Sequence, residues 1–322
     1  MKGRFRVPPI TRAAVGMDPA VKSNRLHHRM PAIFGPFPGP RQSFDGHRRD
    51  GSSSTSKEAF ITFKTPKSAL VSLLPPGFSF QDTSSSDQSA YVTLASKRLD
   101  KLEWLAFRGY NIVSFYIHGT QYVSSSGVVH KGTFLPVLWE DLADPIISGR
   151  EELGFPKLFA DISISETQGS YQMSASWQGS PFLNFSVGDL RAAEGSAPGL
   201  APSEAGTDDG ILLHRYMPTT GRPGVAEIEY PVVVPYAAER KIQQSSTVRR
   251  FVGSSGEVKW SPLDWHSLPT LHHIIKRLAE IPITSIVACG LTEKVGVADF
   301  SSARHVDNEL PDLPITPSSN LN

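Results

Sequence analysis

Residues 144–164 read Asp-Pro-Ile-Ile-Ser-Gly-Arg-Glu-Glu-Leu-Gly-Phe-Pro-Lys-Leu-Phe-Ala-Asp-Ile-Ser-Ile, and the end of this stretch indicates the class of fold. From Leu158 onward a small or aliphatic residue recurs at every second position, which is typical of a strand with one face in a core. The alternation puts Leu158, Ala160, Ile162 and Ile164 on the core face and Lys157, Phe159, Asp161 and Ser163 on the other. We therefore expect a strand over 157–164.

Short runs of the same kind recur along the chain. Runs rich in Val, Ile, Phe, Tyr and Ser, separated by Gly and Pro turns, cover 59–64, 91–95, 110–117, 170–177, 181–187, 225–234 and 283–289. Only two helices are predicted, at 66–74 and 268–281. Because strands outnumber helices and do not alternate with them, we expect an α+β, mostly antiparallel fold with a closed or sandwiched sheet and a few packed helices.

The two ends and one internal segment have the composition of unpacked chain. Residues 1–57 hold eleven Lys and Arg against three Asp, with clustered Pro, Gly and Ser, and are predicted to be a largely disordered arm. Residues 58–305 are expected to form one domain with a flexible insertion at 192–210. Residues 306–322 are expected to form a disordered tail.

Composition argues against several classes of function. The net charge of +1 gives no field for nucleic acid, and no run of about 18 apolar residues predicts a membrane span. The pairs His27-His28 and His272-His273 are adjacent, so neither has the spacing of a metal-chelating pair, and no metal is expected. The basic start lacks the apolar core of a signal peptide, so we expect a cytoplasmic protein, with mitochondrial import as the alternative because no acidic residue precedes Asp18.

Lys157 is the residue whose setting points to chemistry. Pro156 fixes its own φ and stiffens the backbone entering Lys157, and Phe155 and Phe159 are predicted to surround the amine in a substrate site. Burial penalises the charged form and lowers the pKa of a lysine, which favours the neutral amine that attacks a ketone. On the residues alone, a lysine that extends to the surface or pairs with Asp161 remains an alternative.

At Gly149-Arg-Glu151 and Pro156-Lys157 the chain resembles the acetoacetate decarboxylase family, whose members carry these elements at the same spacing. The resemblance extends to 131–139 and 217–223 and, weakly, over about 58–300. It implies a closed or cone-like β-barrel in which Lys157 forms an imine with a β-keto acid. Arg150 and Glu151 are interpreted as structural, setting the turn before Pro156.

The sequence departs from the family pattern at the positions that flank the lysine. Leu158 stands where the family often has a second lysine. By ungapped count the family's pocket glutamate falls near His118, and no Glu lies within ten residues of it, so His118 is the candidate proton donor to the enamine carbon. The best candidate for the family's pocket arginine is Arg49.

These observations predict a Schiff-base decarboxylase of a β-keto acid that needs no cofactor, because the iminium itself accepts the electron pair. The variant of the motif resembles fungal members, which implies a polyketide-derived substrate in secondary metabolism. An aldolase or dehydratase using the same imine, and a catalytically inactive ligand-binding barrel, remain open. We expect a homo-oligomer whose partner is a small keto acid, with no nucleic acid or membrane involved.

Overall fold

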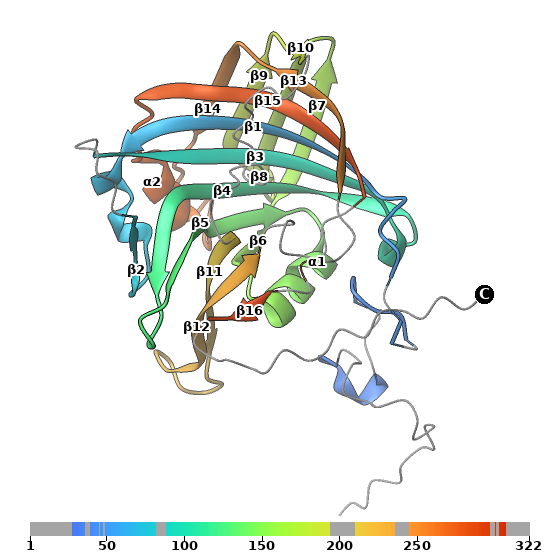
Figure 1. Cartoon of the computed structure of the whole chain (residues 1–322), viewed down its shortest axis with the longest axis vertical. Coiled ribbons are helices and arrows are strands. Elements are labelled where there is room, and N and C mark those ends of the chain that lie inside the picture. Colours follow the sequence, from blue (N-terminus) through green and yellow to red (C-terminus); the bar gives the residue numbers. More distant parts are fainter. Residues whose placement is uncertain are drawn as a thin grey trace, which may run out of the picture.

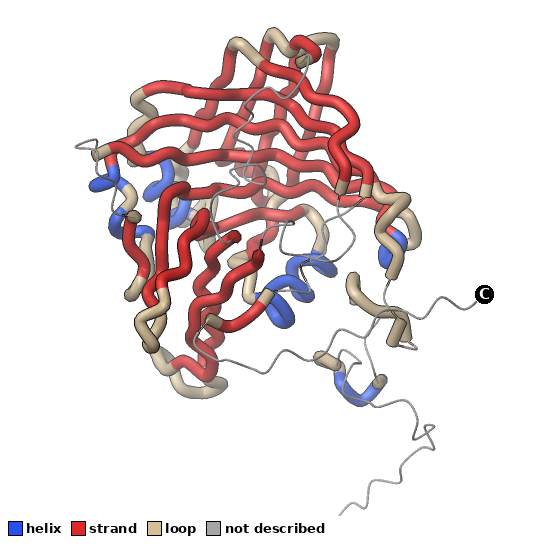
Figure 2. The backbone as a smooth tube through the Cα atoms, in the orientation of Figure 1, coloured by secondary structure: helices blue, strands red, loops and turns tan. Residues whose placement is uncertain are grey.

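The structure is a computed structural model that describes residues 28–35, 39–44, 46–47, 49–81, 88–193, 210–235, 245–296, 300 and 303–306. The first 27 residues of the predicted arm lie outside this range. So do nearly all of the predicted insertion at 192–210 and of the predicted tail at 306–322. Strands dominate the described residues and helices are few (Figure 2), as the sequence predicts.

A strongly curved sheet of twelve strands forms the body of the molecule (Figure 1). Its order is β10 (Arg191–Ala192), β13 (Ser246–Val252), β15 (Ser285–Val295), β1 (Thr55–Pro66), β3 (Ser89–Leu102), β4 (Arg108–Val123), β5 (Val129–Glu140), β11 (Gly210–Pro218), β12 (Ala226–Pro235) and β16 (Arg304–His305). Two short strands lie off this path: β2 (Phe78–Phe80) pairs with β4, and β6 (Lys157–Phe159) pairs with β5. The pairing is antiparallel except for β5 with β6 and with β11.

A second sheet of four strands packs against one face of the large sheet. Its order is β14 (Ser255–Trp260), β9 (Ser180–Gly188), β8 (Ser170–Trp177) and β7 (Asp161–Thr167). One buried core joins the two sheets, and within it the ring of Trp139 lies 5.7 Å from that of Phe182 and 6.0 Å from that of Trp260. Alternation along β1 shows how the faces divide: Ala59, Ile61 and Phe63 enter this core, while Ser56 and Glu58 point to the opposite, concave face.

Helices are short. α1 (Ala143–Ser148) continues directly into a π-helical turn, η6 (Gly149–Leu153), and α2 (His272–Ala279) lies within the helix predicted at 268–281. The helix predicted at 66–74 is instead two 3₁₀ turns, η3 (Lys67–Ala69) and η4 (Val71–Leu73). Two further 3₁₀ turns lie within the described residues, η2 (Ala32–Phe34) and η5 (Glu103–Leu105). In the part of the chain described, no helix has the length and apolar character to cross a membrane.

Two sequence predictions need correction. The closed barrel is not confirmed, because among the described residues the large sheet runs from an edge at β10 to an edge at β16. The strand predicted over 157–164 is two strands: β6 pairs with β5 in the large sheet, whereas β7 belongs to the small one. The predicted alternation nevertheless holds across this change of sheet, since Ala160 and Ile162 are buried and Asp161 is exposed. Leu158 also packs against the core, as expected.

Candidate active site

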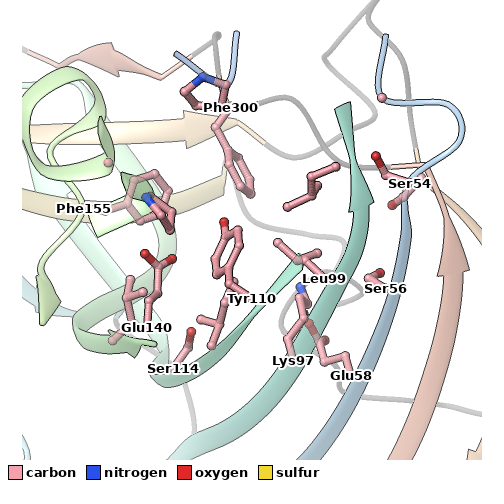
Figure 3. A pocket seen from close by; sticks show the side chains of 18 of the residues that line it. Ser54, Ser56, Glu58, Lys97, Leu99, Tyr110, Ser114, Glu140, Phe155 and Phe300 are labelled. Atoms are coloured by element: carbon pink, nitrogen blue, oxygen red, sulfur yellow. The ribbon is translucent and has the colours of Figure 1, made fainter. Parts of the chain in front are cut away.

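The concave face of the large sheet holds a cavity of about 440 Å³. Residues directly opposite one another on paired strands share a face, so the register sorts the floor of the cavity into rows. The rows are Ser56, Leu99 and Tyr110; then Glu58, Lys97, Ile112 and Glu140; then Ala95, Ser114, Leu138 and Lys157. Figure 3 shows Glu140 and Phe155 on one side of this cavity and Glu58 and Lys97 on the other, with Tyr110 between them.

Lys157 enters the cavity from β6, where its backbone lies beside Leu138 of β5. Its Nζ lies 2.8 Å from Glu140 Oε1, donates a hydrogen bond to the carbonyl oxygen of Pro145 at 3.0 Å, and lies 5.7 Å from the centre of the Phe155 ring. The two charged side chains are 11% and 1% exposed. The amine is therefore held by three fixed groups in a site that bulk water hardly reaches.

Burial dominates the electrostatics of this pair. It lowers the pKa of Lys157, Glu140 opposes that shift, and Arg41 adds to it. Burial also raises the pKa of Glu140, against the effect of Lys157. Both shifts favour the uncharged forms, so the pair can pass one proton between amine and carboxyl inside the cavity.

Glu140 is a candidate site residue that the sequence does not predict. The ungapped count predicts the pocket glutamate near His118, whereas Glu140 ends β5 directly after the buried Trp139. The signal in the sequence is a carboxylate that follows the mainly apolar run 134–139 in the segment before the motif. Its contact with Lys157 depends on the parallel pairing of β5 with β6, which no local pattern predicts.

The Gly-Arg-Glu motif forms the π-helical turn beside the lysine. A Cβ atom on Gly149 would lie 2.3 Å from Lys157 Cε and 2.7 Å from Nζ, so only glycine leaves room for the amine. Arg150 Nη1 donates to the carbonyl oxygen of Lys157 at 2.9 Å, and Arg215 donates to that of Glu151 at 2.6 Å. These contacts support the structural interpretation of Arg150 and Glu151.

Gly149→Ala should therefore lower turnover by about 100-fold, because a displacement of about 1 Å at a reacting group costs roughly that much. Stability should change little, since the crowded atoms belong to the flexible end of a lysine side chain. Steady-state kinetics and thermal melting measure the two effects. Turnover equal to that of the unmodified protein would show that the position of the amine is not critical.

Of the other predicted site residues, two line the cavity and two do not. Phe155 and Arg49 line the cavity, whereas Phe159 is 41% exposed and does not. His118 is also outside the cavity lining, with Nε2 2.7 Å from Thr93 Oγ1 and Nδ1 3.3 Å from Thr133 Oγ1. Burial lowers its pKa to about 4. This placement does not support His118 as the proton donor, because its ring is held by two threonines and does not line the cavity that contains Lys157.

The described part of the arm borders the cavity through its arginines. Arg49 lies 3.3 Å from Glu103 and donates to the carbonyl oxygens of Gly39 and Gln42. Arg41, which also lines the cavity, pairs with Glu152, and buried Arg29 approaches the same carboxylate at 3.1 Å. Burial lowers the pKa of Arg41 to about 10. The described part of the arm thus contributes two guanidinium groups, those of Arg41 and Arg49, to the cavity border.

Two truncations test the arm. Deleting residues 1–27 leaves every arginine just described in place and should change neither melting temperature nor turnover appreciably. Deleting residues 1–50 removes Arg41 and Arg49 and should raise KM for a keto acid by about tenfold or more, because charge-assisted contacts to a carboxylate are lost. Identical kinetics for the two truncated proteins would exclude the arm from substrate binding.

Comparison with known proteins shows the family to which the chain belongs. The sequence model of the family described as acetoacetate decarboxylase (ADC) matches residues 30–289, and the chain belongs to this family. A comparison with curated protein sequences found no match.

Solved structures of similar fold include three at low sequence identity. Acetoacetate decarboxylase from Legionella pneumophila has a TM-score of 0.53 at 13% identity, over 82% of this chain and 92% of that one. An acetoacetate decarboxylase-like enzyme from Sphingomonas wittichii RW1 has a TM-score of 0.52 at 14% identity, over 81% and 95%. The enduracididine biosynthesis enzyme MppR complexed with pyruvate has a TM-score of 0.52 at 13% identity, over 78% and 88%. At such identities the likeness establishes the fold.

Proposed function

We propose that this protein is a Schiff-base-forming decarboxylase of a β-keto acid, with Lys157 as the nucleophile. The observation that carries the proposal is the buried contact between Lys157 and Glu140 in an enclosed cavity, in a chain of the acetoacetate decarboxylase family. A lysine desolvated in this way is neutral more readily, and only the neutral amine has a lone pair to donate.

The reaction follows from the groups in the cavity. The lone pair of Lys157 Nζ attacks the ketone carbon, and protons passed through Glu140 release water to leave an iminium. The carboxylate then leaves as CO2, and the electron pair of the broken carbon–carbon bond moves to the iminium nitrogen to give an enamine. A proton is added to the enamine carbon, and water frees the ketone and the amine.

Two groups are positioned to supply the proton to carbon in place of His118. Glu140 carries a raised pKa, and Tyr110 lines the cavity with its pKa raised by burial and by the carboxylates of Glu140 and Asp141. The raised pKa of Glu140 favours its protonated form, and the raised pKa of Tyr110 keeps its phenol protonated near neutral pH. We infer that Glu140 serves the nitrogen and that Tyr110 is the candidate donor to carbon.

The size of the cavity supports a substrate larger than the simplest β-keto acid. Leucine, isoleucine and aromatic side chains form much of its wall, including Leu99, Leu135, Leu138, Phe155 and Phe300. A polyketide-derived chain in fungal secondary metabolism is the natural substrate that the motif resemblance implies, and this wall would accommodate its apolar part.

An imine can also lead to an aldol or dehydration product. The likeness in fold to MppR complexed with pyruvate makes such a reaction the second candidate function. Product analysis separates the two. With a β-keto acid, the proposed function yields CO2 and a ketone in equal amounts. If imine formation gives no CO2 but an aldol or dehydration product, the decarboxylase proposal is wrong.

A further inference from the structure

Arg215 of β11 contacts the π-helical turn that precedes Lys157, although it does not line the cavity. Its Nη2 donates a hydrogen bond to the carbonyl oxygen of Glu151 at 2.6 Å, and its Nη1 donates to the hydroxyl oxygen of Tyr230 at 2.8 Å. Tyr230 lies directly opposite Arg215 on β12. A guanidinium group is planar and carries its donors in a rigid fork, so two acceptors at fixed positions define its orientation.

The carbonyl group of Glu151 receives from Arg215 a hydrogen bond that its own turn does not supply. In a helical turn the donors would be the N–H groups three to five positions later, at residues 154–156. The first two of these N–H groups both donate to the carbonyl oxygen of Gly149, and the third residue is a proline, which has no N–H. Arg215 therefore satisfies a carbonyl group that the end of the helix leaves without a helical donor.

The side chain of Arg215 is held along its whole length. Gly154 ends the turn with a φ of 77°, and a Cβ atom there would lie 3.0 Å from Arg215 Cδ and 3.1 Å from its Cβ, so the aliphatic stem packs directly on this glycine. Arg215 Cζ lies 5.6 Å from the centre of the Tyr230 ring. That ring is itself packed against His305 of β16, with 4.0 Å between the ring centres. Arg215 thus joins the turn to a pair of packed strands.

The turn that Arg215 holds contacts Lys157 in two ways. Gly149, at its start, lies so close that a Cβ atom would overlap Lys157 Cε and Nζ, and Arg150 donates to the carbonyl oxygen of Lys157 at 2.9 Å. α1 continues directly into the turn and supplies the carbonyl oxygen of Pro145, which accepts a hydrogen bond from the amine. A shift of the turn would therefore move the amine relative to Glu140.

We propose that Arg215 is a positioning residue for the reaction: oriented by Tyr230, it holds the π-helical turn in place and thereby keeps the Lys157 amine beside Glu140. The inference rests on the proposed function of Lys157, because only a reacting amine requires this placement. Arg215 does not line the cavity, so it takes no part in substrate binding. Its loss should therefore lower kcat and leave KM nearly unchanged.

Substitutions at Arg215 and Tyr230 test this role. Arg215→Met removes both hydrogen bonds and keeps an unbranched stem on Gly154. It should lower kcat by about 10- to 100-fold, because a displacement of about 1 Å at a reacting group has an effect of that order, while KM changes by less than about threefold. Arg215→Lys keeps a donor and should recover part of the lost kcat. Tyr230→Phe removes only the hydroxyl group and should lower kcat by about two- to tenfold.

Arg249→Met is the matched control, because Arg249 pairs with Glu293 and does not line the cavity, and it should leave kcat unchanged. Thermal melting of each variant gives the temperature below which all of them are folded, and the rates are compared there. A kcat of Arg215→Met equal to that of the unmodified protein overturns the proposal. So does a loss of kcat/KM that comes from KM alone.

Two further measurements distinguish this inference from the proposed function. Hydrogen exchange of the peptide containing residues 149–155 reports on the turn without any imine, and should be about tenfold or more faster in Arg215→Met. The rate of borohydride trapping of a β-keto acid on Lys157 reports on the amine, and should fall together with kcat. Unchanged exchange, or faster exchange with an unchanged trapping rate, overturns the positioning role while the imine at Lys157 stands. The absence of an adduct in the unmodified protein refutes the proposed function itself, and the positioning role with it.

Discussion

Lys157→Met should reduce turnover of a β-keto acid by at least about 10³-fold, because the substitution removes the nucleophile and leaves a side chain of similar length. The fold should survive, since the pKa of Glu140 is already raised and the carboxyl can take up a proton when its partner is lost. Circular dichroism and thermal melting check the fold, and Lys57→Met is the control for removing a lysine elsewhere. Turnover within a few fold of the unmodified protein would exclude covalent catalysis by Lys157.

Glu140→Gln should lower turnover by about 10²- to 10³-fold through the loss of proton transfer to and from the nitrogen. It should also change the pH dependence in a defined direction. Glu140 raises the pKa of Lys157 against the effect of burial, so a neutral amide lets that pKa fall further. More of the amine is then neutral at any given acidic pH.

The pH at which imine formation reaches half its maximum should accordingly move to lower values in Glu140→Gln. Borohydride trapping across a pH series measures this midpoint independently of turnover. Glu166→Gln is a suitable control, because Glu166 pairs with Lys57 and neither residue lines the cavity. A midpoint that stays fixed or moves upward would show that Glu140 does not stabilise the charged form of Lys157.

Lys157 was predictable as a candidate site residue because its signals are local. Pro156-Lys157, the glycine-containing motif before it and the alternation after it all lie within twenty residues, and the structure places Lys157 in the cavity at the start of β6. The sequence shows Gly149 only as part of a motif. The structure shows why glycine stands there, because the side chain of Lys157 occupies the space that a Cβ atom would need.

The side chains that surround Lys157 were not predictable from the sequence, because pairing between strands brings them together. Glu140 reaches Lys157 through the parallel alignment of β5 with β6. On the other side of the cavity, Glu58 of β1 pairs with Lys97 of β3. The ungapped count that predicts His118 takes no account of strand pairing, and the pairing of β4 with β5 shifts twice near that position. Whether the sheet closes also depends on pairing between distant strands, which explains why the predicted barrel is not confirmed.

The most direct test of this account is borohydride reduction in the presence of a β-keto acid, followed by mass spectrometry of the intact protein and of its peptides. The expected result is one adduct per chain, on the peptide that contains Lys157, and none in Lys157→Met. An adduct that persists in Lys157→Met, or that maps to the peptide containing Lys97, would contradict the assignment of the neutral amine to Lys157.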